Sequence, residues 1–365
     1  MIKTPTRPTT NIDDMSTIML DQVDRLFEQY VTKDRLADAD RGEWPRVIWE
    51  AVQQAGLLLA LVPEAQGGVG LPPVDALRLI RRAAYHTLPI PLGETHNAAA
   101  LWAEASGERV EGALSLAPTG AADSIELERR GDGYALCGRA HRIPWGAQVE
   151  HVLLYARDRA GNGNLALLPR ALVHTEGCRN VANEPRETLI LKDTSLPQHA
   201  IRPAPQVCAE GLLPIGSLLR TQQMVGAMER CLEYALTYAN ERRQFGRPIG
   251  KFQAVQQMLA DAAGQYAAAE AAADCASETY GRPSFAFMAA VAKARVGEAA
   301  GRVAEICHQV HGAIGFTQEH PLHFATRRLW SWRDEFGHEP YWQERIGRLV
   351  CRQGGDALWA TLVDV

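Results

Sequence analysis

The sequence predicts a mainly helical α+β protein with an N-terminal helical domain, a middle antiparallel β domain and a C-terminal helical bundle. Apolar residues recur at helical spacing from about residue 13 to 107, and short alternating runs follow from about 108 to 205. Long alanine-rich amphipathic stretches fill the rest of the chain. We therefore place the domain boundaries at residues 1–107, 108–210 and 211–365.

The N-terminal zone is predicted to be helical because its apolar residues lie on one face when spaced at 3.6 residues per turn. Residues 21–31 and 44–56 show this spacing, and Gly56 is suited to end the second helix. An apolar run closed by a glycine loop follows at 57–70, and helices are expected again at 75–86 and 94–105.

The middle zone is predicted to be a sheet of short strands. Residues 134–137, 151–155 and 165–169 are apolar runs separated by Gly, Asp, Asn and Pro. Residues 131–133 and 161–164 have the composition of hairpin turns. Antiparallel strands joined by such turns account for the whole zone.

The C-terminal zone is predicted to form a bundle of three long helices and further helical segments. The long helices are expected at 218–241, 252–280 and 284–310. Small residues at this density allow helix axes to approach closely, as they do in a bundle core.

Bulk properties exclude several classes of function. A net charge of −5 argues against a nucleic-acid binder, and no apolar run approaches the length of a membrane span. The seven cysteines form no CxxC pair, no histidine group is completed as a metal site, and the first residues lack the apolar stretch of a signal peptide. We expect a cytoplasmic protein with reduced thiols and no bound metal.

A basic turn between two long helices is the first candidate binding feature. Residues 238–257 read YANERRQFGRPIGKFQAVQQ. This segment combines four cationic side chains, the aromatic ring of Phe245 and the start of a new helix at 252–253. Backbone N–H groups and the helix dipole at such a start favour anions. The same composition also fits a solvated surface turn.

Three motifs together resemble the acyl-CoA dehydrogenase family. They are GLL at 56–58 with VPEAQGGVGL at 62–71, ERRQFGRPIGKFQAVQ at 241–256, and QVHGAIGFTQEHP at 309–321. The resemblance runs over nearly the whole chain and implies a C-terminal four-helix bundle. It also implies bound FAD and α,β-dehydrogenation of an acyl-CoA, with electron-transfer flavoprotein as acceptor. A homodimer, homotetramer or heterotetramer with a second chain of this kind is expected.

The resemblance assigns cofactor contacts to the second and third motifs, across a subunit interface. The basic turn would contact the ADP part of FAD and the glycine turn would approach the diphosphate from the partner subunit. The implied residues are Arg242, Phe245, Gln253 (or Gln256), Gln309, Gly312 and Ala313. Ala313 stands where the family commonly has glycine.

The catalytic base is where the sequence departs from the family. The reaction needs a carboxylate that takes the proton alpha to the thioester. The two positions that the resemblance implies hold Phe336 and Gly216, neither of which is acidic. A one-residue shift would make Glu335 the base, or Asp334 with a shorter reach. Alternatively the chain has no base and is the accessory half of a heteromeric dehydrogenase for a steroid-type substrate; a related flavin oxidase or monooxygenase is a third hypothesis.

The β domain departs from the family in the same way. Where the resemblance implies flavin contacts, the chain reads LSLAPTGAADS at 114–124 and HRIPWGA at 141–147. Thr119 remains as a candidate flavin contact, and Trp145 is suited to stack on the isoalloxazine. A tryptophan packed in the core of the sheet explains Trp145 equally well.

Overall fold

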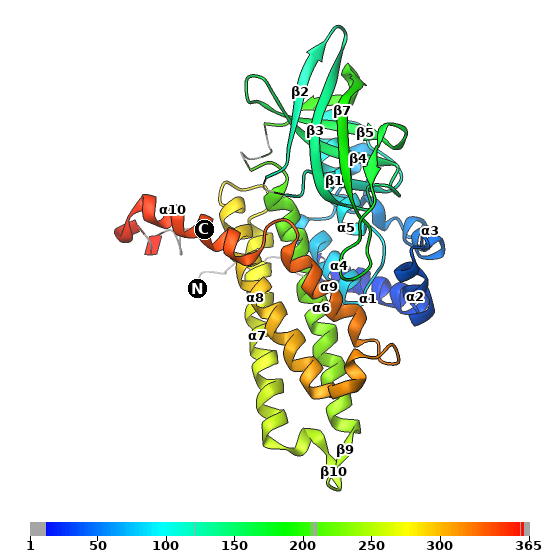
Figure 1. Ribbon diagram of the computed structural model, residues 1–365, viewed down its shortest axis with the longest axis vertical. Helices are drawn as coiled ribbons and strands as arrows, with labels where there is room; N and C mark the ends of the chain where they lie inside the picture. Colours follow the sequence, from blue (N-terminus) through cyan, green and yellow to red (C-terminus); the bar gives the residue numbers. More distant parts are fainter. Residues whose placement is uncertain (1–11, 121, 206, 208–209, 358, 361–365) are drawn as a thin grey trace, which may run out of the picture.

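The computed structural model describes residues 12–120, 122–205, 207, 210–357 and 359–360, with side chains from residue 19 onward. Figure 1 shows the β domain at one end of the long axis and the helical bundle at the other, with the N-terminal helices beside their junction. None of the described helices is long and apolar enough to cross a membrane.

The N-terminal domain consists of helices, as its periodicity predicts. α1 packs on α3 and α4, and α4 in turn packs on α6 of the bundle. Gly56 and Gly42 adopt left-handed backbone conformations that end the preceding helical segments. The bounds are α1 Ile12–Tyr30, α2 Lys33–Arg41, α3 Arg46–Gln54, α4 Pro73–Tyr85 and α5 Leu92–Ser106.

The middle domain is a twisted sheet of eight strands among the described residues. Seven of them lie side by side in the order β6-β7-β3-β2-β4-β5-β8, and the eighth, β1, pairs with β4. The expected turns at 131–133 and 161–164 connect β2 to β3 and β4 to β5. Most pairs are antiparallel, but β4 runs parallel to β1 and β2, so the sheet is mixed. The bounds are β1 Leu114–Ala117, β2 Ser124–Arg130, β3 Gly133–Pro144, β4 His151–Asp158, β5 Gly163–Pro169, β6 Thr175–Glu176, β7 Arg186–Pro197 and β8 Ile201–Pro203.

The C-terminal domain is a helical bundle in which α6 packs on α7, α8 and α9. A two-stranded hairpin joins α6 to α7 at the far end of the bundle (Figure 1). α10 projects from the body, and only its first turn is buried. The bounds are α6 Leu213–Glu241, β9 Arg243–Gln244, β10 Arg247–Pro248, α7 Gln253–Glu278, α8 Phe285–His311, η6 Gly312–Phe316, α9 Leu322–Asp334 and α10 Glu339–Gln353.

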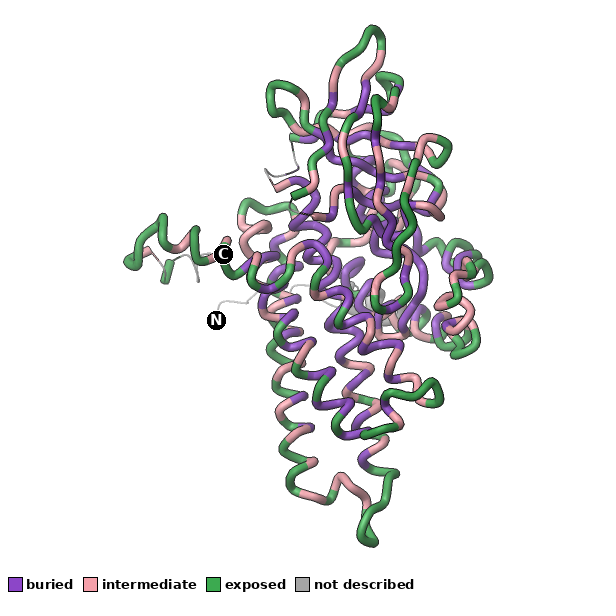
Figure 2. Tube along the Cα trace, viewed as in Figure 1, coloured by how far each residue is buried: buried purple, intermediate pink, exposed green. Residues whose placement is uncertain are grey.

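Burial is continuous from the sheet into the upper half of the bundle (Figure 2). One core cluster joins the N-terminal helices to the inner face of the sheet, and a second fills the bundle with alanine, valine and leucine side chains. The order of helices, sheet and helical bundle expected from the sequence is thus confirmed.

Candidate functional site

The α9–α10 loop, residues 335–338, carries the first candidate base and is held tightly. Lys293 of α8 donates from Nζ to the carbonyls of Arg333 at 2.6 Å and Gly337 at 2.7 Å. These two carbonyls lie on either side of Glu335 in the chain. Phe336 and Gly337 both have positive φ angles, of 54° and 90°. These two hydrogen bonds tie the loop to α8, and the backbone turn at Phe336 and Gly337 sets where the neighbouring side chains point.

Glu335 points inward, where guanidinium groups bind both of its oxygens. Arg186 Nε donates to Oε1 at 2.7 Å and Arg220 Nε donates to Oε2 at 2.6 Å. Burial raises the pKa of the Glu335 carboxyl, but the charges of the two arginines outweigh it and hold the pKa at about 2. A carboxylate in this state is a poor proton acceptor, so the geometry argues against the expectation that Glu335 is the base.

Glu335 belongs to a buried chain of alternating charges that crosses all three domains. Three carboxylates and three guanidinium groups balance one another. Each contact is between 2.6 and 3.1 Å, and every side chain is at most 6% exposed. In order the members are Glu94 of α5, Arg220 of α6, Glu335, Arg186 of β7, Glu184 before β7 and Arg328 of α9.

The two positions where the family resemblance implies a base face each other and are filled. Phe336 is 1% exposed, and a Cβ built on Gly216 would lie 1.9 Å from its ring. The guanidinium of Arg220 lies 5.4 Å from the centre of the same ring. The ring of Phe336 thus fills the space that a side chain at position 216 would need.

Asp334 points the other way, toward the loop cavity, a hollow of about 640 Å³ between the β domain and the start of α10. Asp334 is exposed, and the cavity is completed by Arg142 from the sheet and by His338 and Tyr341 from the helical side. His338 is fixed there because its Nδ1 accepts a hydrogen bond from the backbone N–H of Tyr341 at 3.1 Å. Of the two acidic candidates, Asp334 is the one that lines a cavity.

A bulge in β3 forms the sheet side of the loop cavity. The register between β3 and β7 shifts between Ala140 and Ile143, and Arg142 has a φ of 58°. Thr119 donates to the carbonyl of His141 at 2.8 Å, and Asp123 accepts from the backbone N–H of His141 at 2.8 Å. These contacts fix the bulge, and bulges beside cavities are a common way to turn backbone groups toward a ligand.

Neither Thr119 nor Trp145 is among the residues that line the loop cavity. Thr119 is buried and spends its hydroxyl on His141. Trp145 is 5% exposed, belongs to the core of the sheet and lies under the guanidinium of Arg186 at 4.9 Å. The core interpretation of Trp145 therefore fits better than a ring stacked on a flavin, and Thr119 acts on the cavity only through the bulge.

The basic turn and the glycine turn lie away from the loop cavity, toward the other end of the bundle (Figure 1). Phe245, at the tip of the β9–β10 hairpin, is 91% exposed, and Arg242 beside it is exposed. Gln253 is exposed at the first turn of α7. One chain thus presents these residues outward and does not bring them to Asp334.

The glycine turn is open in the same way. Gly312 has a φ of 64°, and a Cβ built on it would meet no atom within 4 Å. Gln309 and Ala313 are exposed on either side of it. Below the turn, His311 stacks on Tyr238 of α6 with ring centres 4.8 Å apart, which anchors it to the bundle.

Known proteins match this chain at both of its helical ends. The family model for the acyl-CoA dehydrogenase N-terminal domain matches residues 14–106, and the model for the acyl-CoA dehydrogenase C-terminal domain matches residues 209–333. The chain belongs to the acyl-CoA dehydrogenase family.

Individual members of the acyl-CoA dehydrogenase family are similar over most of this chain. Acyl-CoA dehydrogenase FadE34 of Mycobacterium tuberculosis is 30% identical over 327 residues, which are 84% of this chain and 42% of FadE34. The match therefore spans less than half the length of that relative.

Two solved structures share the fold over nearly their full length. The ChsE4-ChsE5 complex from Mycobacterium tuberculosis has a TM-score of 0.84 at 24% identity and covers 95% of this chain and 98% of its own. A Tcur3481-Tcur3483 steroid ACAD variant has a TM-score of 0.83 at 25% identity and covers 93% and 99%. The helix–sheet–bundle fold is therefore that of the acyl-CoA dehydrogenases.

Family membership implies a flavin, and two regions of this chain have residues that fit one. The bulge at His141 and Arg142 turns strand backbone toward the loop cavity. The volume of the loop cavity, about 640 Å³, suits a ring system. Arg242 is an exposed guanidinium of the kind that suits a diphosphate, and the open Gly312 would allow close backbone approach. These residues fit FAD provided that two chains share one cofactor, since a single chain separates the two groups.

The most important site residues that sequence reasoning missed are Lys293, Arg186 and Arg220. All three are charged, at most 1% exposed and bonded to residues of the α9–α10 loop or its flanks. A signal was present for Lys293 and Arg220, because each is a cation within an apolar stretch of a long helix. Arg186 lies at the start of a strand and carries no comparable signal.

Proposed function

We propose that this chain is a subunit of an FAD-dependent acyl-CoA dehydrogenase assembly, in which a second chain of the family supplies the catalytic base. The observation that carries the proposal is the packing of Phe336 against Gly216. The buried ring of Phe336 stands at one implied base position and fills the space at the other, Gly216. Arg186 and Arg220 bind the carboxylate of the neighbouring Glu335. The two-protein names of the ChsE4-ChsE5 and Tcur3481-Tcur3483 structures support a heteromer.

This chain would contribute binding surface rather than proton transfer. Arg242 and Phe245 would contact the ADP part of an FAD seated in the partner, and Gln309, Gly312 and Ala313 would approach its diphosphate. Gln253 would lie beside them on α7. Flavin, when bound, supplies the acceptor for a hydride from the substrate. Electron-transfer flavoprotein is the proposed electron acceptor of the assembly.

Asp334 favours a second candidate function, in which the chain is itself a dehydrogenase or a related flavin oxidase. Its carboxylate is exposed at the loop cavity, where the bulge at Arg142 could hold the edge of a ring. Proton abstraction from a substrate in this cavity would then fall to Asp334, with His338 close by on the same loop.

Spectroscopy separates these candidates. The chain is purified alone and together with candidate dehydrogenase chains, and flavin absorbance is followed as acyl-CoAs of several sizes, steroid-type thioesters included, are added anaerobically. A heteromeric assembly gives bleaching only with the partner, and Asp334→Asn leaves it unchanged. Bleaching by the chain alone that Asp334→Asn abolishes, with Asp38→Asn on α2 as the matched control, would replace the first proposal with the second. Oxygen uptake without an added acceptor would identify an oxidase.

A further inference from the structure

Four histidines gather beneath the glycine turn, where α6, α8 and α9 pack together. The rings of His311 and His320 have centres 4.4 Å apart, and His311 also stacks on Tyr238 of α6. His308 lies one helical turn before His311 on α8, and His323 belongs to the first turn of α9. We call residues 308, 311, 320 and 323 the histidine cluster.

The hydrogen bonds of the cluster favour neutral rings. His323 Nδ1 accepts from the guanidinium of Arg327 at 3.3 Å, so a proton there would face a cation. His308 Nε2 is bonded to the hydroxyl of Thr326 at 2.9 Å, and its Nδ1 is buried with no hydrogen-bond partner among the described residues. A proton on His308 Nδ1 would thus be a buried donor without an acceptor, which costs free energy.

His320 is the member of the cluster that binds the start of a helix. Its Nδ1 accepts a hydrogen bond from the backbone N–H of Leu322, the first residue of α9, at 3.1 Å. Lys33 of α2 donates from Nζ to the carbonyl of Glu319 at 2.9 Å, which brings an ammonium group to the same segment. Protonation of His320 Nδ1 would break its bond to Leu322 and add a cation at the positive end of α9, beside Lys33.

The groups around the cluster compensate poorly for an added proton. Burial, followed by the charges of His311, His323 and Lys33, lowers the pKa of His320 to about 4. Burial also lowers the pKa of each of the other three rings. The carboxylate of Asp40 favours a charged His323, but Arg327 already binds it. The titratable and charged groups that face the cluster are Lys33 and Asp40 of α2, Arg230, Tyr234 and Tyr238 of α6, Cys307 of α8, Glu319 before α9, and Arg327 and Arg328 of α9.

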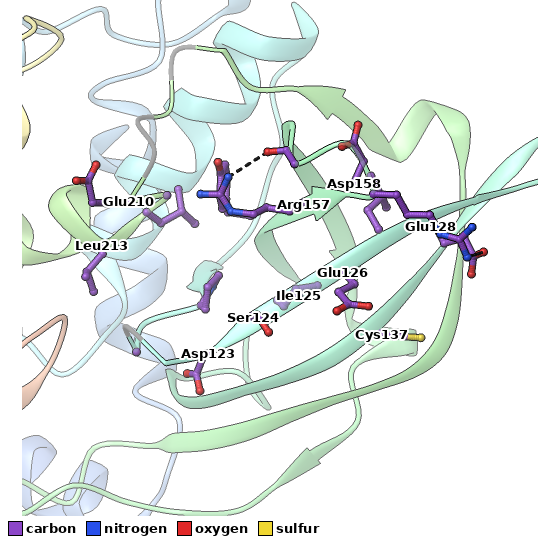
Figure 3. Close-up of a pocket in the computed structure, with 18 of the residues that line it drawn as sticks. Asp123, Ser124, Ile125, Glu126, Glu128, Cys137, Arg157, Asp158, Glu210 and Leu213 are labelled. Atoms are coloured by element: carbon purple, nitrogen blue, oxygen red, sulfur yellow. Dashed lines mark hydrogen bonds and ion pairs between the residues drawn. The ribbon is translucent and has the colours of Figure 1, made fainter.

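A second group of titratable residues lies in the β domain and is balanced differently. It lines a hollow of about 840 Å³ beside β2, where Figure 3 shows Glu128, Asp158 and Arg157. Carboxylates and guanidinium groups lie together there, and Glu128 forms an ion pair with Arg159. The histidine cluster, in contrast, sets rings against rings and against cations, so a proton has a larger effect there.

We propose that the histidine cluster is an acid-sensitive latch, in which neutral His320 holds residues 317–321 closed and its protonation releases them together with the glycine turn. This turn and its flanks carry Gln309, Gly312 and Ala313, which the proposed function directs toward a cofactor of the partner subunit. Acid would therefore weaken the assembly. That consequence rests on the proposed function, whereas the opening of the turn is a property of this chain alone.

Amide hydrogen exchange on the full chain measures the opening directly. The pKa of His320 is about 4 in the closed turn against an ordinary 6.5, so the closed turn is favoured above pH 6.5 and loses that advantage as the pH falls toward 4. Between pH 7 and pH 5 the opening constant should rise about 5- to 20-fold, the lower figure allowing for solvent at this half-buried ring. The amides to follow are Leu322, bonded to the ring, and Thr317, bonded to the carbonyl of Ile314. After correction for the intrinsic effect of pH on exchange, their protection factors should fall by the same ratio and stay below those of α7 amides.

Two variants and one titration decide the result. His320→Asn keeps an acceptor two residues before the N–H of Leu322 but does not titrate, so its protection should change less than about 2-fold between pH 7 and pH 5. His199→Asn, exposed before β8, should lose protection as the wild type does. Equal losses in His320→Asn and the wild type overturn the latch, as does protection in the wild type that acid leaves unchanged or lowers only together with all of α7. A ring titration of wild-type His320 by NMR at or above pH 6.5 also overturns it. Failure to find a flavin or a partner would refute the proposed function and leave these measurements untouched.

Discussion

Replacement of Glu335 by glutamine tests whether this carboxylate stabilises the fold or acts as a base. The substitution keeps the shape of the side chain but leaves Arg186 and Arg220 without the charge between them. The pKa of about 2, against an ordinary value of 4.5, corresponds to about 3 kcal/mol at 1.36 kcal/mol per pKa unit. Removal of one partner from a buried pair costs about 3–5 kcal/mol in other proteins, so both routes agree.

The sign of the pH dependence gives a second readout. The folded-state pKa of Glu335 lies below its unfolded value, so its contribution is present above pH 4.5 and is lost as the pH falls toward 2. Urea unfolding followed by circular dichroism should therefore show Glu335→Gln less stable than the wild type by about 3 kcal/mol at pH 7, with the difference shrinking near pH 3.

Glu50→Gln is the matched control, because its pair with Arg46 is exposed on α3 and should contribute less than about 0.5 kcal/mol. A loss below about 1 kcal/mol in Glu335→Gln would refute the structural role. If flavin bleaching by an acyl-CoA also disappeared while stability was kept, Glu335 would be restored as the candidate base.

Three further substitutions probe the loop and the exposed hairpin. Gly216→Ala should lose about 1–3 kcal/mol of unfolding free energy, because its Cβ would lie 1.9 Å from a buried ring, whereas Gly264→Ala, with open space around it on α7, should gain up to about 1 kcal/mol. Lys293→Met should destabilise the chain and flatten its pH dependence. Burial lowers the pKa of this amine to about 7 from 10.5, so the wild type gains stability as the pH rises through that range; an unflattened profile in urea titrations would contradict this. Phe245→Ser should reduce assembly and flavin content, measured by sedimentation velocity and absorbance, while Val69→Ser, 44% exposed on the N-terminal domain, should change neither.

Much of the fold could be predicted because it follows from local patterns. The alanine-rich periodicity of residues 284–310 predicts α8, which spans Phe285–His311, almost to the residue. The turn at 131–133 predicts the β2–β3 hairpin. The parallel pairing of β4 with β1 and β2 could not be predicted, since composition does not encode which strands meet across the sheet.

The candidate site was harder to predict because it depends on the directions of neighbouring side chains. The sequence placed Glu335 ahead of its neighbour Asp334 as the candidate base, but α9 ends between them and they point to opposite sides of the loop. Gly216 and Phe336 were two separate alternatives in the sequence, 120 positions apart, and only packing shows them to be one occupied space. The roles of Arg242 and Gly312 stay predictions, because their expected ligand lies in another subunit.

The buried chain of charges from Glu94 to Arg328 limits how this protein can be divided or recombined. A β domain grafted onto the helices of a relative would bring Arg186 and Glu184 to a surface that lacks their partners. An isolated bundle would likewise retain Arg220 and Arg328 with only one of their three carboxylates, that of Glu335. Chimeric chains should therefore fold stably only where all six residues are exchanged together, which means that the three domains have to come from the same parent protein.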